Sequence, residues 1–254
     1  MKKRKAGIVI FVIVLIITAV RIKSMDSHRI SGRILAENIA GPGMMRLVEQ
    51  SMQAQAQKTS VTEIAVKEWK HPQAALTFDD GPDIRYTPLL LHGLKERNVR
   101  VSFFLLGEKV EQYPELVERM QKEGHLVGNH TYHHVQLNKL NETKAREEIL
   151  KTNNLIYETT GVYPLYLRPP FGAWKKNLEL CVEMLPVFWT IDTLDWKVQN
   201  TEKIVRTVQE QIEDGAIILM HDEYDTSVEA ALQVVDELKN QEYELVTVDQ
   251  LILP

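Results

Sequence analysis

Two short stretches of the chain carry side chains of the kinds that bind metals and transfer protons. Asp79 and Asp80 are adjacent, and His130 and His134 lie four residues apart, so that one helical turn between the histidines would let them face the same way. Two histidines, one carboxylate and an open coordination position form a catalytic site for a divalent metal, most often zinc. The other aspartate of the pair is then available as a general base for an attacking water. These residue types and spacings predict metal-assisted hydrolysis.

Purely structural interpretations of the same residues stay open at this point. The sequence Asp79-Asp80-Gly81-Pro82 is typical of a turn. A lone H-x-x-x-H pair is often exposed to solvent, and His133, inside that pair, is interpreted as a surface or supporting residue. The metal hypothesis is favoured because the aspartates and the histidines follow two different expected strands, and the carboxyl ends of parallel strands meet at one edge.

Hydrophobic patterns from residue 71 onward alternate between short apolar runs and longer amphipathic stretches. Because strands alternate with helices, we expect parallel βαβ units in an α/β fold, a distorted (β/α) barrel of about seven parallel strands. No G-x-G-x-x-G motif follows the first expected strand, which disfavours a dinucleotide-binding fold. The expected strands are 74–78, 99–106, 125–129, 165–168, 187–191, 216–220 and 244–248, and the expected helices are 88–97, 114–123, 143–159, 176–184, 202–213 and 228–240.

Titratable residues follow five of these expected strands. Besides the two motifs above, the fourth strand runs into Arg168-Pro169-Pro170-Phe171-Gly172 and the fifth into Asp192-Thr193-Leu194-Asp195-Trp196, while the sixth ends at His221-Asp222. Chemistry in α/β barrels collects at the carboxyl ends of the strands. We therefore expect all of these groups at one rim.

Five motifs in this order resemble those of the NodB-homology polysaccharide deacetylases, carbohydrate esterase family four. The resemblance covers roughly residues 71–250, and it implies a distorted barrel of about seven or eight parallel strands. The motifs are T-F-D-D-G-P at 77–82, H-T-Y-H-H at 130–134, R-P-P-F-G at 168–172, D-T-L-D-W at 192–196 and L-M-H at 219–221.

The resemblance assigns the metal site and the base. It implies that Asp80, His130 and His134 bind the metal. It also implies that Asp79 takes a proton from the water that attacks the acetyl carbonyl. Arg168 would hold Asp79 in place and keep it ionised, because a guanidinium is always charged.

The acid and the substrate contacts also follow from the resemblance. His221 would protonate the departing sugar amine, and Asp195 would raise the pKa of His221. The backbone N–H near Phe171 would help to stabilise the oxyanion. Phe171 and Trp196 are interpreted as walls of a sugar-binding groove, and Trp189 as a core residue inside its strand.

The first 23 residues are expected to form a membrane anchor or an export signal. A basic pentapeptide, MKKRK, precedes an uncharged apolar run at 6–20, and Arg21-Ile22-Lys23 follows. As a helix this run spans roughly 22 Å, against roughly 30 Å for the hydrocarbon core, and the flanking basic side chains can extend it. An uncleaved anchor is favoured over a cleaved signal, with everything after the run outside the cell.

The rest of the chain is divided into a spacer at 24–70 and a deacetylase domain at 71–254. Six of the 30 Lys and Arg residues lie in the first 23 residues, without any acid, so the remainder is strongly acidic and disfavours nucleic acid as a partner. The single cysteine, Cys181, cannot form an internal disulfide.

These inferences predict a hydrolase that uses a divalent metal, zinc first, with cobalt, manganese or nickel as alternatives. Its expected reaction is removal of N-acetyl groups from an N-acetylglucosamine-containing polysaccharide, and the expected position outside the membrane favours peptidoglycan. Chitin-oligomer deacetylation and acetylxylan ester hydrolysis are alternatives within the same chemistry. A glycosidase would need two carboxylates on either side of a glycosidic bond, which the adjacent Asp79 and Asp80 do not suit. Non-catalytic carbohydrate binding would not need Asp79, Arg168 and His221 as an acid–base set.

Overall fold

The structure is a computed structural model that describes residues 71–174 and 184–252. Its strands form one sheet in which every pairing is parallel, in the order β5-β4-β3-β2-β1-β7-β6, with β8 beside the start of β1. The expected parallel α/β barrel is confirmed. The strands are β1 (Gln73–Asp79), β2 (Ser102–Leu105), β3 (Leu126–Asn129), β4 (Tyr166–Leu167), β5 (Leu185–Pro186), β6 (Ile191–Asp192), β7 (Ala216–His221) and β8 (Glu244–Leu245).

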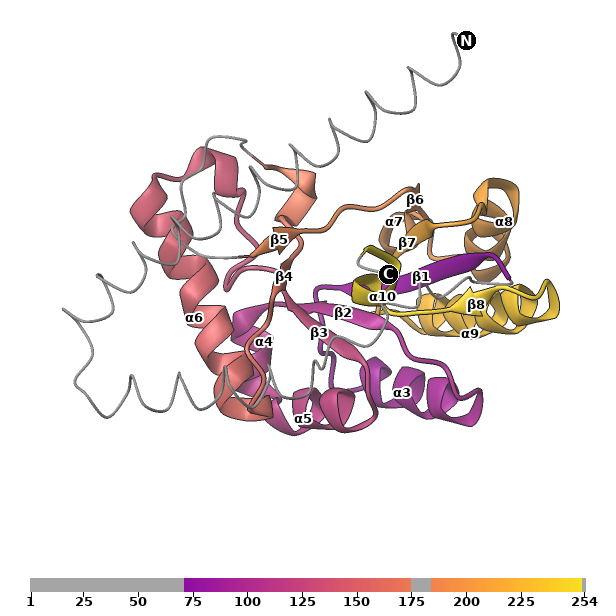
Figure 1. Cartoon of the computed structure of the whole chain (residues 1–254), viewed down its shortest axis with the longest axis horizontal. Helices are drawn as coiled ribbons and strands as arrows, with labels where there is room; N and C mark the ends of the chain where they lie inside the picture. The colour runs from indigo at the N-terminus through magenta and orange to yellow at the C-terminus, as the bar shows by residue number, and fades with distance from the viewer. Residues whose placement is uncertain (1–70, 175–183, 253–254) are drawn as a thin grey trace, which may run out of the picture. The chain divides into compact units, whose positions relative to one another are not determined.

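Helices surround this sheet (Figure 1). Five of the six expected helices are found within a few residues of their predicted bounds, and the sixth, at 176–184, lies almost wholly outside the described residues. They are amphipathic: on α8, for example, Ile204, Val205 and Val208 are buried on one face. The helices are α3 (Tyr86–Glu96), α4 (Gly107–Gln112), α5 (Pro114–Lys122), α6 (Glu142–Thr160), α7 (Asp195–Val198), α8 (Thr201–Gln211), α9 (Asp225–Asn240) and α10 (Val248–Ile252), with 3-10 turns η1 (Leu137–Lys139) and η2 (Pro170–Gly172).

The central strand β1 is buried along its whole length, and its two faces pack into different hydrophobic clusters. Ala74, Leu76 and Phe78 belong to the large core cluster that β1 shares with the surrounding helices. Ala75, on the other face, belongs to a smaller cluster inside the barrel. Because strand side chains alternate, Asp79 lies on the same inner face as Ala75.

The register of β1 places two of the expected catalytic residues side by side. Asp79 pairs with His221 at the end of β7 and with Phe104 on β2. All three positions are at the carboxyl edge of the sheet. The parallel arrangement therefore brings residues far apart in sequence to one rim, as the sequence predicts.

The strand expected at 187–191 is not formed. Two short strands flank it instead: β5 ends at Pro186 and pairs with β4, and β6 starts at Ile191 and pairs with β7. They lie at opposite ends of the described sheet, so the barrel is open between them. The apolar run therefore crosses this opening. Similarly, the run at 244–248 divides into β8 and the start of α10.

The expected membrane segment at 6–20, the spacer at 24–70 and Cys181 lie outside the described residues. Within 71–174 and 184–252, no helix has the length and apolar character needed to cross a membrane. The anchor and the domain boundaries stay predictions.

Candidate active site

A cavity of about 470 Å³ opens at the carboxyl edge of the sheet. Seven of the nine predicted site residues line it, whereas Arg168 and Asp195 are fully buried directly behind it. The structure thus brings together every residue that the sequence assigns to the site. The lining residues are Asp79, Asp80, His130, His134, Phe171, Trp189, Asp192, Trp196, Leu219, His221, Glu223 and Tyr224.

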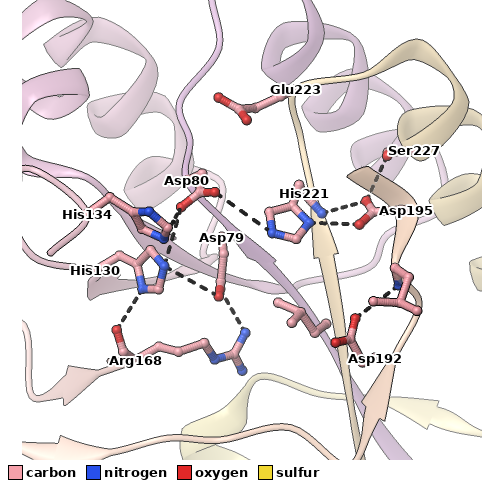
Figure 2. A network of polar contacts seen from close by, with 12 residues as sticks. Asp79, Asp80, His130, His134, Arg168, Asp192, Asp195, His221, Glu223 and Ser227 are labelled. Carbon is pink, nitrogen blue, oxygen red and sulfur yellow. Dashed lines mark hydrogen bonds and ion pairs between the residues drawn. The ribbon is translucent and has the colours of Figure 1, made fainter. Parts of the chain in front are cut away.

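The three expected metal ligands converge on one point (Figure 2). Oδ1 of Asp80 lies 3.3 Å from Nε2 of His130 and 3.4 Å from Nε2 of His134. One ligand atom from each residue lies within 4.8 Å of the others. A single metal ion can therefore reach all three.

Two further observations show that these residues fit a metal. Oδ1 of Asp80 is buried and has no hydrogen-bond partner among the described residues. Nδ1 of His130 lies 2.6 Å from the carbonyl oxygen of Arg168, which can only accept, so Nδ1 carries a proton and Nε2, on the side of Asp80, is the nitrogen that can bind a metal. Burial alone would raise the pKa of Asp80, but His130, His134 and His221 lower it well below the ordinary value. The carboxylate is thus held in the charged form that a metal needs.

The backbone reaches this geometry through left-handed residues. Asp80, Thr131 and His134 have φ angles of 69°, 67° and 56°. The sequence suggested that one helical turn brings His130 and His134 to the same side. That expectation is wrong, because the segment between them contains no helix and the left-handed residues turn the chain instead.

Asp79 is buried beside a buried guanidinium. Nη1 of Arg168 donates to Oδ1 of Asp79 at 2.8 Å and to Oγ1 of Thr77 at 2.7 Å. The guanidinium lies 4.2 Å from the ring centre of Phe104. Burial lowers the pKa of Arg168 from its ordinary value and Asp79 opposes the shift. A guanidinium is not deprotonated in proteins, so Arg168 stays charged. The predicted pairing of Arg168 with Asp79 is present.

His221 and Asp195 form a second pair on the opposite side of the cavity. Nδ1 of His221 lies 2.7 Å from Oδ1 of Asp195, and Oδ2 of Asp195 accepts from the His221 backbone N–H at 2.8 Å and from Ser227 Oγ at 2.7 Å. Burial lowers the pKa of His221, but the bond to Asp195 and the charges of Asp195, Asp79 and Asp80 raise it to about 9. His221 is therefore protonated at neutral pH, with Nε2 directed toward Asp80 (Figure 2).

Aromatic side chains form the outer wall. Phe171 and Trp196 are 62% and 49% exposed, which leaves their rings open to a large substrate. The Phe171 ring centre is 4.5 Å from that of His134. Trp189 also lines the cavity, so its interpretation as a core residue is wrong. It lies in the opening between β5 and β6, where the sequence predicts a continuous strand. The oxyanion contact near Phe171 stays a prediction.

Some residues of the site were not singled out from the sequence. Glu223 and Tyr224, directly after β7, line the cavity, and Ser227 supports Asp195 from α9. Asp192 stands within a quoted motif but received no role; its Oδ1 accepts from the Leu194 backbone N–H at 3.0 Å. Position after a strand was an available signal for Glu223 and Asp192, whereas nothing in the sequence marks Ser227.

An open parallel α/β barrel with three convergent metal ligands and an acid–base set at its carboxyl edge has the organisation of a metal-dependent hydrolase. Residues 67–187 match the family model for polysaccharide deacetylase. The chain is 39% identical over 186 residues to a peptidoglycan-N-acetylglucosamine deacetylase of Bacillus cereus, covering 70% of this chain and 68% of that protein. The chain therefore belongs to the polysaccharide deacetylase family.

Two more relatives extend the comparison. The solved structure of peptidoglycan deacetylase PdaC from Bacillus subtilis matches with a TM-score of 0.70 and 40% identity, covering 72% of this chain and 91% of that one. PdaC is named a peptidoglycan-N-acetylmuramic acid deacetylase. PgdA of Listeria monocytogenes, named a peptidoglycan-N-acetylglucosamine deacetylase, is 42% identical over 177 residues, or 70% of this chain. The match spans 38% of the Listeria protein.

Proposed function

We propose that this chain is a metal-dependent hydrolase that removes N-acetyl groups from N-acetylglucosamine residues of peptidoglycan. The observation that carries the proposal is the convergence of three sets of residues on one cavity. The first set is the metal ligands Asp80, His130 and His134. The second is the proposed base, Asp79, with its partner Arg168. The third is the proposed acid, His221, with its partner Asp195. Each step of amide hydrolysis then has a residue to perform it.

The metal side of the cavity prepares the attack. Asp80, His130 and His134 would hold a divalent metal, which we propose to be zinc, and this ion would supply polarisation of the acetyl carbonyl and a lowered pKa of water. Asp79 accepts the proton of the attacking water through the carboxylate that Arg168 orients at 2.8 Å. Arg168 is buried and its Nη1 donates to Asp79, so it holds the carboxylate in a fixed position at the cavity.

The opposite side completes the reaction. Collapse of the tetrahedral intermediate expels the sugar nitrogen, which needs a proton to leave as an amine. His221 donates that proton from Nε2, because Asp195 binds Nδ1 at 2.7 Å and stabilises the charged ring. The base and the proton donor therefore belong to two separate ion pairs, Asp79 with Arg168 and His221 with Asp195.

The polymer is proposed from the relatives and from the shape of the site. Relatives at about 40% identity are named as deacetylases of peptidoglycan, acting on N-acetylglucosamine or on N-acetylmuramic acid. The exposed rings of Phe171 and Trp196 beside the cavity suit a long polysaccharide. A cell-surface location, through the expected anchor at 6–20, would give the enzyme access to the wall.

The proposal is tested by incubating the full-length chain with purified peptidoglycan, with chitin oligomers and with acetylated xylan. Acetate is quantified after metal removal by a chelator and again after zinc is restored, and digested peptidoglycan is analysed by mass spectrometry to locate the deacetylated sugar. We expect zinc-dependent acetate release from peptidoglycan, with the lost acetyl group on N-acetylglucosamine. Release that survives complete metal removal would contradict the mechanism, and release from another polymer alone would contradict the substrate.

A further inference from the structure

A carboxylate on α6, that of Glu148, binds the backbone of the segment that carries both histidine ligands. Oε2 of Glu148 accepts from the backbone N–H of Tyr132 at 3.0 Å and from that of His133 at 2.9 Å. Oε1 of the same side chain lies 2.8 Å from Nδ1 of His133. One glutamate thus binds two successive peptide groups between His130 and His134.

Neighbouring contacts fix the beginning of this segment. Oδ1 of Asn129 accepts from the Thr131 backbone N–H at 2.6 Å, and Nδ2 of Asn129 donates to the Ile149 carbonyl and to Asn153 on α6. On the other side, the Gly107 backbone N–H donates to the Thr131 carbonyl at 2.9 Å. These contacts stop short of His134. Glu148 holds the 131–132 and 132–133 peptide groups, so its contacts reach to within one peptide group of His134.

The backbone needs such support because of its conformation. Thr131 and His134 both have left-handed φ angles, and Thr131 is β-branched, for which this region is strongly disfavoured. Each such residue is strained, and its conformation persists only where the surroundings hold it in place. Two successive N–H groups that point at one anion form a concave site, and a carboxylate there stabilises the turned backbone.

We propose that Glu148 is a positioning residue, which preorganises the 130–134 segment so that Nε2 of His134 faces Asp80. This inference rests on the proposed metal site. Glu148 does not line the catalytic cavity; it contacts the backbone and His133, whose side chain is 59% exposed. Its effect on the metal must therefore pass through the position of His134, whose Nε2 is 3.4 Å from Asp80.

Substitutions of Glu148 separate the effect of its negative charge from the effect of where its side-chain oxygens lie. Glu148→Gln removes the charge but keeps an oxygen at the right reach for both N–H groups. Glu148→Asp keeps the charge but shortens the side chain by one methylene, and Glu148→Ala removes both. Glu147→Ala is the matched control, because Glu147 is an exposed carboxylate one residue earlier on the same helix.

The readout is the affinity of the metal-free, full-length protein for Zn²⁺, measured by competition with a chromogenic chelator. The visible spectrum of the Co²⁺-loaded protein reports ligand geometry, and thermal unfolding without metal reports folding. Loss of a residue that orients metal ligands typically weakens metal affinity about 10- to 100-fold. We expect such a loss for the Asp and Ala substitutions, with an altered Co²⁺ spectrum, and values within about threefold of the parent for Glu148→Gln and Glu147→Ala.

Several outcomes would overturn the inference. If Glu148→Asp binds Zn²⁺ like the parent while Glu148→Gln is weakened, the charge matters and the position does not. If all variants that fold bind like the parent, Glu148 supports only the fold. If Glu148→Ala does not fold, the Gln and Asp substitutions decide between these results. If the parent itself fails to bind Zn²⁺, the proposed metal site fails, and this inference with it.

Discussion

Two histidines, one buried and one mostly buried, lie at the opposite edges of the parallel sheet, and their surroundings shift their pKa values in opposite directions. His221 ends β7 at the carboxyl edge, and its pKa is raised to about 9. His125 directly precedes β3 at the amino edge, and its pKa is lowered to about 4. At neutral pH one ring is charged and the other is neutral.

Burial does not explain this difference, because it lowers the pKa of both rings. His221 has a fully buried carboxylate, Asp195, 2.7 Å from Nδ1. Nδ1 of His125 instead accepts from the Val101 backbone N–H at 3.1 Å, which requires that nitrogen to be unprotonated. The charge of Glu123 raises the pKa of His125, with Nε2 4.0 Å from its carboxylate, and those of Arg100 and Arg119 lower it.

The comparison indicates that the carboxyl edge of the sheet serves catalysis and the amino edge serves stability. The carboxyl edge holds charged, paired groups that face a cavity, and these suit proton transfer. The amino edge buries a neutral histidine against Phe103, which suits stability. The same substitution, histidine to asparagine, should therefore affect activity at one end and the pH dependence of stability at the other.

The largest effect is expected from His221→Asn. The amide nitrogen of asparagine can replace Nδ1 as a donor to Asp195, so the fold is preserved, but the proton donor Nε2 is lost. We expect kcat for acetate release to fall about 10²- to 10⁴-fold. The free energy of unfolding in urea should fall by about 2–3 kcal/mol at pH 7, because the folded state loses the proton that Asp195 holds on His221. A fall in kcat of less than about tenfold would remove His221 from the role of acid.

A smaller effect is expected from Asp195→Asn, which leaves His221 in place but removes the charge that holds its proton. The pKa of His221 should fall from about 9 toward its ordinary 6.5. At pH 8 the protonated fraction of His221, and with it kcat, should then drop roughly 30-fold. The alkaline limb of the kcat–pH profile should move to lower pH. Ser227→Ala is the control, since it removes a hydrogen bond to Asp195 but keeps the charge. An unmoved alkaline limb would contradict the pairing.

The smallest effect on activity is expected at the amino edge, where the change is in stability instead. The folded state keeps His125 neutral, whereas the unfolded chain takes up a proton below pH 6.5. The stabilisation from His125 is therefore complete above pH 6.5 and is lost as the pH falls toward 4, amounting to about 3 kcal/mol at most. His125→Asn keeps an acceptor for the Val101 N–H but does not titrate, so its free energy of unfolding should vary less than that of the parent between pH 7 and 4. Identical pH profiles for parent and variant would show that His125 titrates alike in both states.

The sequence is enough to predict which residues lie at the carboxyl edge of the sheet, but not every segment that lines the cavity there. Asp79, Asp80 and His221 follow buried apolar runs, and parallel pairing alone places the ends of such runs together. The run at 187–191 misleads because strands of only two residues, such as β5 and β6, leave no periodicity to detect.

The contacts that support the site are harder to predict than the site itself. Glu148 looks like any other acid on the amphipathic helix α6, and only the folded chain brings it to the backbone of Tyr132 and His133. The left-handed turns at Thr131 and His134 likewise depend on long-range contacts. For the same reason, local sequence suggested a helical turn there.

The measurement that tests the account most directly is acetate release from peptidoglycan by the zinc-loaded, full-length parent and its Asp79→Asn variant. Asparagine keeps an oxygen for Arg168 but cannot take a proton from water, and the metal ligands are untouched. We expect zinc binding and unfolding to match the parent, while kcat falls at least about 10²-fold. A folded, zinc-loaded variant that retains more than a tenth of the parent rate would contradict Asp79 as the base and with it the proposed division of roles at this edge.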